Sequence, residues 1–492
     1  MLYGGLYYFL TNTPMLPLIV ASSTIAHILE ILFILIWAST IIVVITENRN
    51  PVKTLAWVMI LVFLPIVGFV LYLLFGMDMR KVKIIGRRSL SRLMKEPLLN
   101  YKDYVAPEAP APYEKLTRMM RQAGQSYLLE GNKATPFTDF AILLQDMLRT
   151  IASAKHHIHV QFYIFMDDAV GCLLRDALID KARQGVKVRL LYDDVGSWKA
   201  KNSFFRAMQQ EGIEVYPFGE VKFAALTKRV NYRNHRKVVV IDGKVGYIGG
   251  VNIADRYYKG LSWGGWRDTH VRIEGMAVNA LQTSFFVDWY YASRILISEP
   301  AYFPKVERCG DTAMQIVTSY PMGEWKTIMQ GLLQVISQSR NYLYIQTPYF
   351  LPTEPILMAL RNAALAGVDV RLMVPHRGDS LLADLASRSY YKEVMMAGVK
   401  IYQYKPGYLH AKMLLSDDNF VTVGSTNMDF RSFEQNFEIN AFIYDPEVVK
   451  TMKRIFMADQ QQSTRIIPAE WKRRPLWNRF WESLVRLLSP LL

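Results

Sequence analysis

The sequence predicts an α/β protein with two similar domains, preceded by a transmembrane helical hairpin. A short motif occurs twice, and all five of its residue types repeat at an offset of 175 residues. Alternating apolar strands and helical segments surround both copies, as in α/β folds. Two long apolar segments stand ahead of them near the N-terminus.

The two apolar segments predict transmembrane helices over about residues 25–46 and 54–75. Residues 55–75 carry no charge, and about 20 apolar residues are enough to cross a bilayer. A polar turn over residues 47–53 would join the helices. A cleaved signal peptide would have a basic region before its apolar stretch, and none is present. Several Lys and Arg residues over 80–88 follow the second segment, so we expect the rest of the chain to face the cytoplasm.

The composition predicts an anionic partner. The formal net charge is +15, and 51% of the residues are hydrophobic. A basic balance is typical of proteins that bind nucleic acid or an anionic membrane, and the apolar segments favour the membrane. Cys172 and Cys309 are too few for a disulfide framework. Since no His, Cys or carboxylate group has metal-ligand spacing, we expect chemistry without a metal ion or other cofactor.

The pattern along the chain predicts five parts. Membrane segments occupy residues 1–90, and a proline-rich linker occupies 91–112. The two domains follow over 113–310 and 311–465. In the last part, 466–492, aromatic and leucine residues recur at helical spacing. This spacing predicts an amphipathic helix in a lipid headgroup layer, and packing onto the protein's own surface is the alternative.

The repeated motif reads His-x-Lys-x(4)-Asp-x(6)-Gly-x-x-Asn. Its two copies are His235, Lys237, Asp242, Gly249 and Asn252, and His410, Lys412, Asp417, Gly424 and Asn427. Residues two apart on a strand face the same side, so each His and Lys would enter one pocket together. The Asp stands where the strand turns back, which indicates a structural role in the turn. The Gly allows close backbone approach, and the Asn amide can donate to phosphoryl oxygens.

The motifs, together with the segments NYRNHRK, YIQTPYFLP and RLLSPLL, resemble bacterial cardiolipin synthases of the phospholipase D superfamily over about residues 47–492. The resemblance implies two phospholipase D-like domains about a pseudo-twofold axis, with the site at their seam. The residues that it marks as catalytic are His235, Lys237, Asp242, His410, Lys412 and Asp417. Gly250 departs from the pattern, since the second copy has Ser425 there, so we expect the two halves to bind phosphate unequally.

Two imidazoles can divide the work of phosphodiester transfer between a nucleophile and an acid–base group. The resemblance assigns the nucleophile, which would form a phosphohistidine, to His235 and the acid–base role to His410. Asp268 and Glu438 lie in matching strands, and we expect them to orient the imidazoles. The residues expected to bind phosphate are Asn252, Ser425, Asn427, Gly249 and Gly424.

The resemblance, together with the two apolar segments, implies a multi-pass enzyme of the bacterial inner membrane that acts on phosphatidylglycerol. It would transfer the phosphatidyl group of one phosphatidylglycerol to another, giving cardiolipin and glycerol. Its partners would be phosphatidylglycerol and anionic lipid, with no nucleic acid. A phospholipase D that makes phosphatidic acid is an open alternative, because water competes for the same intermediate. The membrane segments disfavour a nuclease, and two intact motifs disfavour a non-enzymatic scaffold.

Overall fold

The computed structural model describes residues 16–46, 51–72, 76, 84–102, 104–106, 111–220 and 232–489. The chain divides into an N-terminal helical unit and a large α/β unit. Each unit is described by itself.

The N-terminal unit contains α2 (Leu16–Thr46), α3 (Pro51–Phe63) and α4 (Pro65–Leu71). Trp37 of α2 donates its indole N–H to the carbonyl of Leu61 in α3, at 2.7 Å. Val44, Leu61 and Tyr72 form a small core between these helices. The two apolar segments therefore pack together, as the hairpin prediction requires.

The second apolar segment is not one continuous helix, contrary to the prediction for residues 54–75. The helix ends at Phe63 and begins again at Pro65, because proline lacks an N–H and its ring clashes with the preceding turn. Among the described helices, 26–46 is the one long and apolar enough to span a membrane, with a mean hydropathy of 2.8. Residues 73–75 lie outside the described residues.

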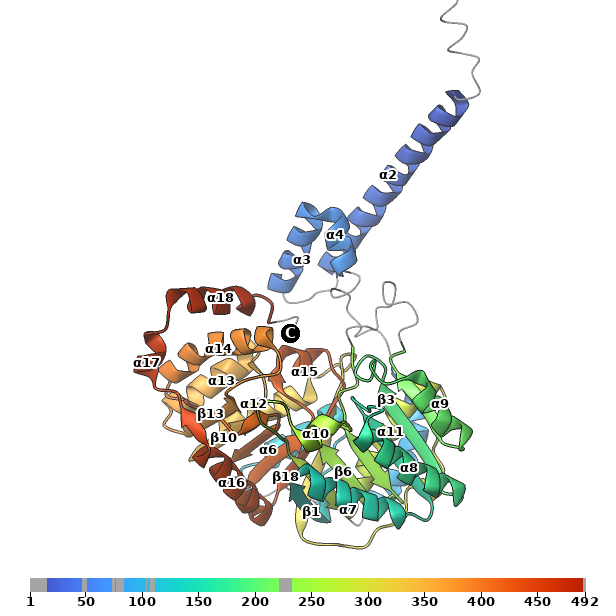
Figure 1. The fold of residues 1–492 in the computed structure, drawn as a ribbon, viewed down its shortest axis with the longest axis vertical. Helices are drawn as coiled ribbons and strands as arrows, with labels where there is room; N and C mark the ends of the chain where they lie inside the picture. Colours follow the sequence, from blue (N-terminus) through green and yellow to red (C-terminus); the bar gives the residue numbers. More distant parts are fainter. Residues whose placement is uncertain are drawn as a thin grey trace, which may run out of the picture. The chain divides into compact units, whose positions relative to one another are not determined.

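The large unit is built on one mixed sheet of 15 strands (Figure 1). From the centre outward, the first half contributes β1 (Leu129–Phe137), β8 (His270–Glu274), β6 (Val245–Gly249), β5 (Val238–Ile241), β2 (His157–Phe162), β3 (Lys187–Asp193) and β4 (Glu214–Phe218). The second half contributes β9 (Thr312–Ser319), β18 (Glu438–Tyr444), β16 (Phe420–Gly424), β15 (Met413–Ser416), β10 (Tyr342–Gln346), β12 (Asp369–Pro375), β13 (Lys400–Tyr404) and the edge strand β19 (Ser463–Arg465).

The two halves repeat the same topology. In each half, three strands run parallel, namely β2, β3 and β4 or β10, β12 and β13, and the strands nearer the centre pair antiparallel. The second half adds the edge strand β19, antiparallel to β13. The halves join where β1 pairs antiparallel with β9, so a pseudo-twofold axis passes between these two strands. The predicted α/β fold with two similar domains is confirmed.

Helices cover the sheet in both halves. Those of the first half are α7 (Phe140–Ala152), α8 (Ala169–Arg183), α9 (Asn202–Gln210), α10 (Asp255–Lys259) and α11 (Ala277–Ser293). Those of the second half are α12 (Thr327–Gln338), α13 (Glu354–Leu365), α14 (Leu381–Met396), α15 (Phe430–Glu434) and α16 (Pro446–Gln461). All residues of β2 and β10 are buried, as expected for strands that are covered on both faces.

Short strand pairs also form beside the main sheet. They are β7 (Gly265–Arg267) with β14 (Gly407–Leu409), and β11 (Phe350–Leu351) with β17 (Met428–Asp429). The first pair joins one half to the other across the seam.

The segment before the first half differs from its prediction. Helix α5 (Arg87–Tyr101) occupies much of the expected linker at 91–112 and buries Leu93 beside Phe285 and Trp289. Helix α6 (Glu114–Gly124), expected to open the first domain, packs on α12 in the core of the second half. Pro97 lies inside α5 without ending it, since tertiary packing holds the apolar residues of this helix.

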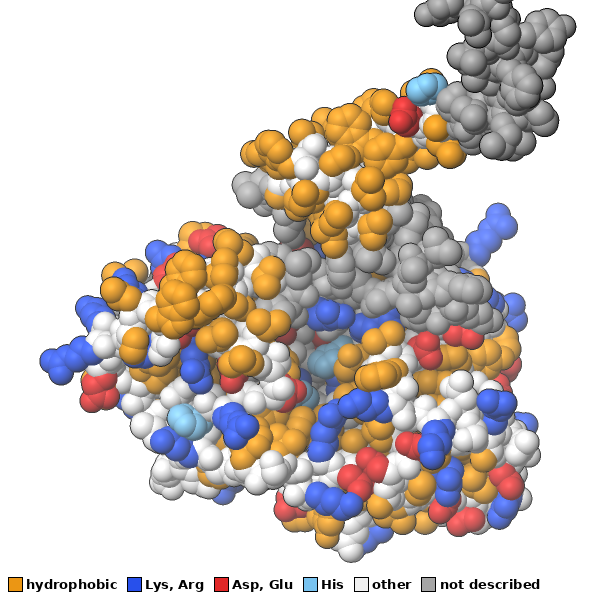
Figure 2. All heavy atoms as spheres, turned by 45° about the horizontal axis from the view of Figure 1, so that its top comes forward, with side chains coloured by type: hydrophobic (Ala, Val, Ile, Leu, Met, Phe, Trp, Pro, Cys, Tyr) orange, Lys and Arg blue, Asp and Glu red, His pale blue; other side chains and the backbone are white. Residues whose placement is uncertain are grey.

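The C-terminal segment forms α17 (Pro468–Lys472) and α18 (Leu476–Arg486). Helix α18 docks on α14, where Val485 is buried and Arg486 donates to Glu393 at 3.2 Å. Its other apolar side chains, with two leucines that follow the helix, stay exposed and form the orange patch that Figure 2 shows over this helix. They are Leu476, Trp477, Phe480, Trp481, Leu484, Leu487 and Leu488. The helix is thus amphipathic, with its apolar face left open.

Candidate active site

The two motif histidines lie at the seam because each backbone is held by the other half. His235 precedes β5, and its N–H donates to the carbonyl of Phe437 at 3.0 Å. His410 precedes β15, and its N–H donates to the carbonyl of Arg267 at 2.7 Å. The repeat therefore brings together two imidazoles that are 175 residues apart in the chain.

Both imidazoles line one cavity of about 330 Å³ between the halves. Figure 2 shows a hollow in this region with histidine at its floor and basic side chains around it. Asn252 and Asn427 line the same cavity. Over the described part of the chain, no group of three or more His, Cys, Asp or Glu residues is arranged to hold a metal ion.

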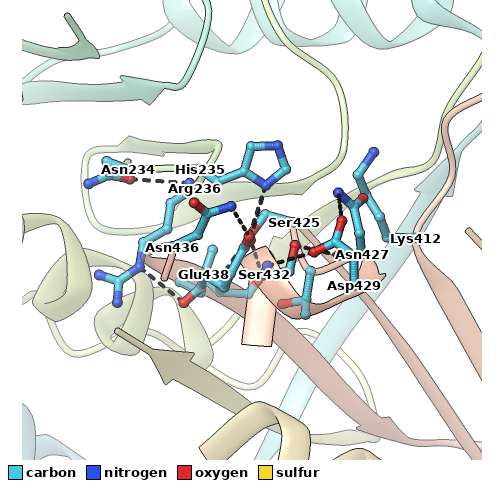
Figure 3. A network of polar contacts seen from close by, with 12 residues as sticks. Asn234, His235, Arg236, Lys412, Ser425, Asn427, Asp429, Ser432, Asn436 and Glu438 are labelled. Carbon is cyan, nitrogen blue, oxygen red and sulfur yellow. Dashed lines mark hydrogen bonds and ion pairs between the residues drawn. The ribbon is translucent and has the colours of Figure 1, made fainter. Parts of the chain in front are cut away.

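Each imidazole is paired with a carboxylate from the other half. His235 Nδ1 donates to Glu438 Oε1 at 3.0 Å, as Figure 3 shows, and His410 Nδ1 donates to Asp268 Oδ2 at 2.6 Å. A carboxylate only accepts, so this pairing places the hydrogen on Nδ1 and leaves Nε2 with a free lone pair. At His410, Lys412 Nζ also lies 2.8 Å from Nδ1 and competes with Asp268 for that atom. The two carboxylates are not in matching strands as predicted, since Glu438 begins β18 whereas Asp268 lies between β7 and β8. The crossing of the seam comes from the fold.

Burial favours the neutral form of both imidazoles. It lowers the pKa of His235 to about 4, and the Glu438 carboxylate offsets this only in part. Burial likewise lowers the pKa of His410 to about 4, and the positive charge of Lys412 acts in the same direction. A neutral imidazole with a free Nε2 is ready to act as a nucleophile.

The motif lysines follow the histidines just before β5 and β15, outside the strands that the spacing predicted, and neither is among the described residues that line the cavity. Each donates to the carbonyl of the histidine two residues before it. Burial lowers the pKa of Lys237 well below its usual range and that of Lys412 to about 8. Lys412 Nζ lies 3.9 Å from Asp268. With a pKa of about 8, Lys412 keeps its positive charge next to His410 at neutral pH.

Ser425 does not lie where a phosphate-binding residue would. Its hydroxyl donates to Glu438, and Asn436 Nδ2 donates to the same carboxylate at 3.1 Å (Figure 3). Ser425 is fully buried and is not among the described residues that line the cavity. Its observed contact is with the carboxylate that orients His235, and not with the space that a phosphate would fill.

The motif glycines also serve packing instead of lining the cavity. A Cβ on Gly424 would lie 2.3 Å from the carbonyl of Ile439 in β18, and one on Gly249 would lie 2.5 Å from the carbonyl of Thr269. These positions let the neighbouring strand approach closely. The expectation that Gly249 and Gly424 touch phosphate does not fit this placement.

Asp242 and Asp417, which the resemblance placed among the catalytic residues, lie at the strand turns. Both have positive φ angles, 53° and 51°. Asp242 accepts from the backbone N–H groups of residues 155, 156 and 157, and Asp417 accepts from those of 340, 341 and 342. These bonds outweigh burial and lower the pKa of Asp242. The structural interpretation from the turn pattern agrees with this geometry.

Several cavity residues have no part in the motif. Arg233, Arg256, Arg431, Tyr163 and Trp266 line the cavity beside the histidines. Arg256 and Arg431 stand four residues after the motif Asn in their own halves, at the same offset of 175. This repeat was a signal that sequence reasoning missed.

Arg236, next to His235 in the chain, turns away from the cavity. Its guanidinium donates to Asp288 at 2.8 Å and to Ser284 at 3.1 Å. Figure 3 shows it directed away from the imidazole. Its positive charge is therefore paired with Asp288 inside the fold.

Two family models match the chain. The model described as "Cardiolipin synthase, PLD-like domain" matches residues 147–273 and 332–460, one match in each half of the sheet. The model described as "Phospholipase_D-nuclease N-terminal" matches residues 34–76.

Similar proteins extend over nearly the whole chain. The major cardiolipin synthase ClsA of Bacillus subtilis (strain 168) is 41% identical over 477 residues, covering 94% of this chain and 99% of its own length. A cardiolipin synthase of Geobacillus kaustophilus (strain HTA426) is 39% identical and covers 92% and 91%. A crystal structure of phosphatidylserine synthase from Haemophilus influenzae Rd KW20 shares the fold, with a TM-score of 0.60 and 14% identity over 77% of this chain and all of that one.

The doubled sheet and the two facing His–Lys pairs define a protein of the phospholipase D superfamily. Within that class, the family model and relatives near 40% identity narrow the assignment. The chain belongs to the cardiolipin synthase family.

Proposed function

We propose that this protein is a phosphatidyltransferase that joins two phosphatidylglycerol molecules into cardiolipin and releases glycerol. One observation carries the assignment of residues. Two neutral imidazoles, each with a free Nε2 and each oriented by the other half's carboxylate, line a single cavity. Such a pair can supply both groups that phosphodiester exchange needs.

In the first step, His235 Nε2 attacks the phosphorus of the donor lipid. The bond from phosphorus to the glycerol headgroup oxygen breaks, and His410 gives its proton to that oxygen. Burial favours neutral His410, but a bound phosphodiester adds a negative charge next to it and favours the imidazolium, which takes its proton from solvent. Asp268, 2.6 Å away, stabilises the same form. Positive charge on the motif lysines would stabilise the negative charge that builds up on the phosphoryl oxygens.

In the second step, a second phosphatidylglycerol takes the place of glycerol. His410 removes the proton of its headgroup hydroxyl, and that oxygen attacks phosphorus. The bond from phosphorus to His235 Nε2 breaks, which releases cardiolipin and restores both imidazoles. His410 takes up one proton from solvent when the donor lipid binds, gives it to glycerol, and regains one from the acceptor hydroxyl, so atoms and protons balance over the cycle.

Water is the competing acceptor in the second step. It would give phosphatidic acid from the same phosphohistidine, and the motif residues alone do not distinguish the two outcomes. The relatives are named cardiolipin synthases, which supports transfer.

The protein is proposed to be a multi-pass protein of the bacterial inner membrane, with the α/β unit on the cytoplasmic side. The two apolar segments that pack together in the N-terminal unit support the anchor. The net charge of +15 suits a surface of anionic lipid. No nucleic acid is expected as a partner.

Helix α18 is proposed to insert its open apolar face into the headgroup layer. Trp477 is 65% exposed and Leu487 is 75% exposed, although Val485 on the docked face is buried. A helix that faced only water would not present this face. Since α18 packs on α14, whose residue Ala383 lines the catalytic cavity, this contact would hold the site at the lipid surface.

The insertion of α18 can be measured on the full chain in phosphatidylglycerol liposomes. An environment-sensitive fluorophore would be attached to Leu484→Cys, or to Asn478→Cys as a control on the same helix, with Cys172 and Cys309 replaced by serine. Emission at position 484 is expected to shift to the blue relative to position 478. Equal emission at both positions would contradict insertion.

The function itself is tested with the purified protein and phosphatidylglycerol as the sole lipid. Mass spectrometry would follow cardiolipin, glycerol and phosphatidic acid, with His235→Ala and His410→Ala as controls. Cardiolipin with equimolar glycerol, absent from both variants, is the expected result. Phosphatidic acid without cardiolipin would make the protein a hydrolase.

A further inference from the structure

Arg256 lies on the wall of the catalytic cavity beside His410. It comes from α10, which begins three residues after Asn252. Its guanidinium carbon lies 5.2 Å from the ring centre of Trp266, and that ring lies 5.2 Å from the imidazole of His410. Arg256 therefore lies on the His410 side of the cavity, where the proposed mechanism places the leaving glycerol and the incoming lipid.

The Arg256 guanidinium is held by aromatic rings. It lies over Trp266 and, at 5.9 Å, over Tyr257. Its buried Nε has no hydrogen-bond partner among the described residues. Contact with ring faces fixes the guanidinium plane and leaves its N–H edges able to bind an anion.

The arginines near His235 are used differently. Arg233 donates to the buried carboxylate of Asp193 at 3.4 Å, and Arg236 donates to Asp288 at 2.8 Å. A carboxylate thus already offsets part or all of each charge. The ion pairs of the described residues include no such carboxylate for Arg256, so its positive charge faces the cavity.

The proposed reaction brings two phosphates into this cavity in its second step. One is the phosphoryl group on His235, and the other belongs to the incoming phosphatidylglycerol. In that lipid the reacting hydroxyl and the phosphate lie at opposite ends of one glycerol headgroup. When the hydroxyl is at His410, its phosphate lies one glycerol length away, along the wall of the cavity. Water, ethanol and the departing glycerol carry no such phosphate.

We propose that Arg256 binds the phosphodiester of the acceptor lipid and thereby selects phosphatidylglycerol over water and simple alcohols as the acceptor. This inference rests on the proposed transferase function and names the subsite that favours transfer. A guanidinium edge suits the two free oxygens of a phosphodiester because it can donate two parallel hydrogen bonds. Trp266 and Tyr257 shape the wall that presents it.

A competition between two acceptors tests the assignment. Full-length protein in phosphatidylglycerol liposomes would receive a fixed concentration of ethanol, and mass spectrometry would follow cardiolipin and phosphatidylethanol in the same reaction. Both products use the same first step, so their ratio isolates the choice of acceptor. Arg256→Ala is expected to lower the ratio of cardiolipin to phosphatidylethanol by about 10- to 100-fold, the effect of losing charge-assisted hydrogen bonds. Phosphatidylethanol formation then also reports that the site is folded.

Matched variants complete the test. Arg256→Lys keeps a positive charge but cannot donate two parallel hydrogen bonds. Its ratio of cardiolipin to phosphatidylethanol is expected to lie between those of the parent protein and Arg256→Ala. Arg206→Ala removes an exposed arginine on α9, and the ratio should equal that of the parent protein. An unchanged ratio in both Arg256 variants would overturn the inference, and so would a parallel loss of both products in Arg256→Lys. Phosphatidylethanol without any cardiolipin from the parent protein would instead refute the proposed function, and the acceptor subsite with it.

Discussion

The two halves hold their catalytic imidazoles by the same crossing but with different residues. Glu438 contacts His235 and is braced by the hydroxyl of Ser425 and the amide of Asn436. Asp268 contacts His410 and is braced by the backbone N–H of Thr269. Glu438 has the longer side chain and is held by other side chains, whereas Asp268 has the shorter one and is held by a backbone N–H.

The position that differs in the motif explains how both arrangements fit. A Cβ on Gly250 would lie 2.1 Å from Asp268 Oδ1, so the first half needs glycine there. The equivalent Ser425 uses its hydroxyl on Glu438. The pairs Asp–Gly and Glu–Ser are therefore two solutions to one task, which is to aim a carboxylate across the seam. The turn residues Asp242 and Asp417 are alike in both halves because the turn is the same.

Replacing either orienting carboxylate by its amide should have the largest effect on activity. Glu438→Gln and Asp268→Asn keep the shape but lose the strong acceptor for Nδ1–H, so the wrong tautomer becomes populated. We expect kcat/KM for cardiolipin formation to fall by about 100- to 10,000-fold in each variant. Ser425→Ala, which keeps Glu438 and Asn436, should lose about 10-fold or less. Equal activity of Glu438→Gln and the parent protein would exclude the crossed pairing as a catalytic feature.

Exchanging the residues at the motif position that differs, Gly250 and Ser425, should impair the first half more than the second. Gly250→Ser places new atoms against Asp268, so activity should fall by about 10- to 100-fold and the melting temperature should drop. Ser425→Gly removes one hydrogen bond to a charged group, which is worth about 1.5–3 kcal/mol, and leaves the packing intact. Activity assays with thermal melts of both variants check this order. A harmless Gly250→Ser would contradict the steric explanation.

The pH profile should separate the roles of His235 and Lys412. Activity should fall as the pH drops through about 4, because the nucleophile His235 becomes protonated. It should also fall as the pH rises through about 8, because Lys412 loses its charge. Lys412→Arg keeps its charge at high pH, so its alkaline limb should move upward while the acid limb stays in place. An alkaline limb unmoved by this change would assign it to another group.

The turn aspartates should affect stability and leave catalysis nearly unchanged. Asp242→Asn tolerates the positive φ but weakens the bonds to three backbone N–H groups. We expect a loss of about 1–2 kcal/mol in the free energy of unfolding, with normal activity per folded molecule. Asp417→Asn should behave in the same way. A normal melting temperature with lost activity would return the aspartate to the catalytic residues.

The doubled motif carried most of the prediction because its residue types have direct geometric meaning. His and Lys two apart on a strand must share a face, and an Asp at a strand reversal must shape the turn. The repeat of strands around both copies predicted two equivalent halves. The antiparallel pair of β1 and β9 at their centre then fixes how the halves join.

The remaining features depend on tertiary contacts that no local pattern encodes. Ser425 and the motif glycines were expected at phosphate, but they pack against β18 and β8. The partner of each histidine depends on which strands meet across the seam. Helix α5 forms where a linker was predicted, because Leu93 packs into a core of aromatic residues. Arg256 was visible as a repeat with Arg431, but its place beside His410 is known only from the fold.

The most direct test of the crossed two-histidine site is to find the covalent intermediate. The protein would be mixed with phosphatidylglycerol, quenched within one turnover, and digested for mass spectrometry, with His235→Ala and His410→Ala treated in parallel. A phosphatidyl group on His235 is predicted in the parent protein, with none anywhere in His235→Ala. A phosphatidyl group on His410, or cardiolipin formation by His235→Ala, would contradict the assignment of the nucleophile.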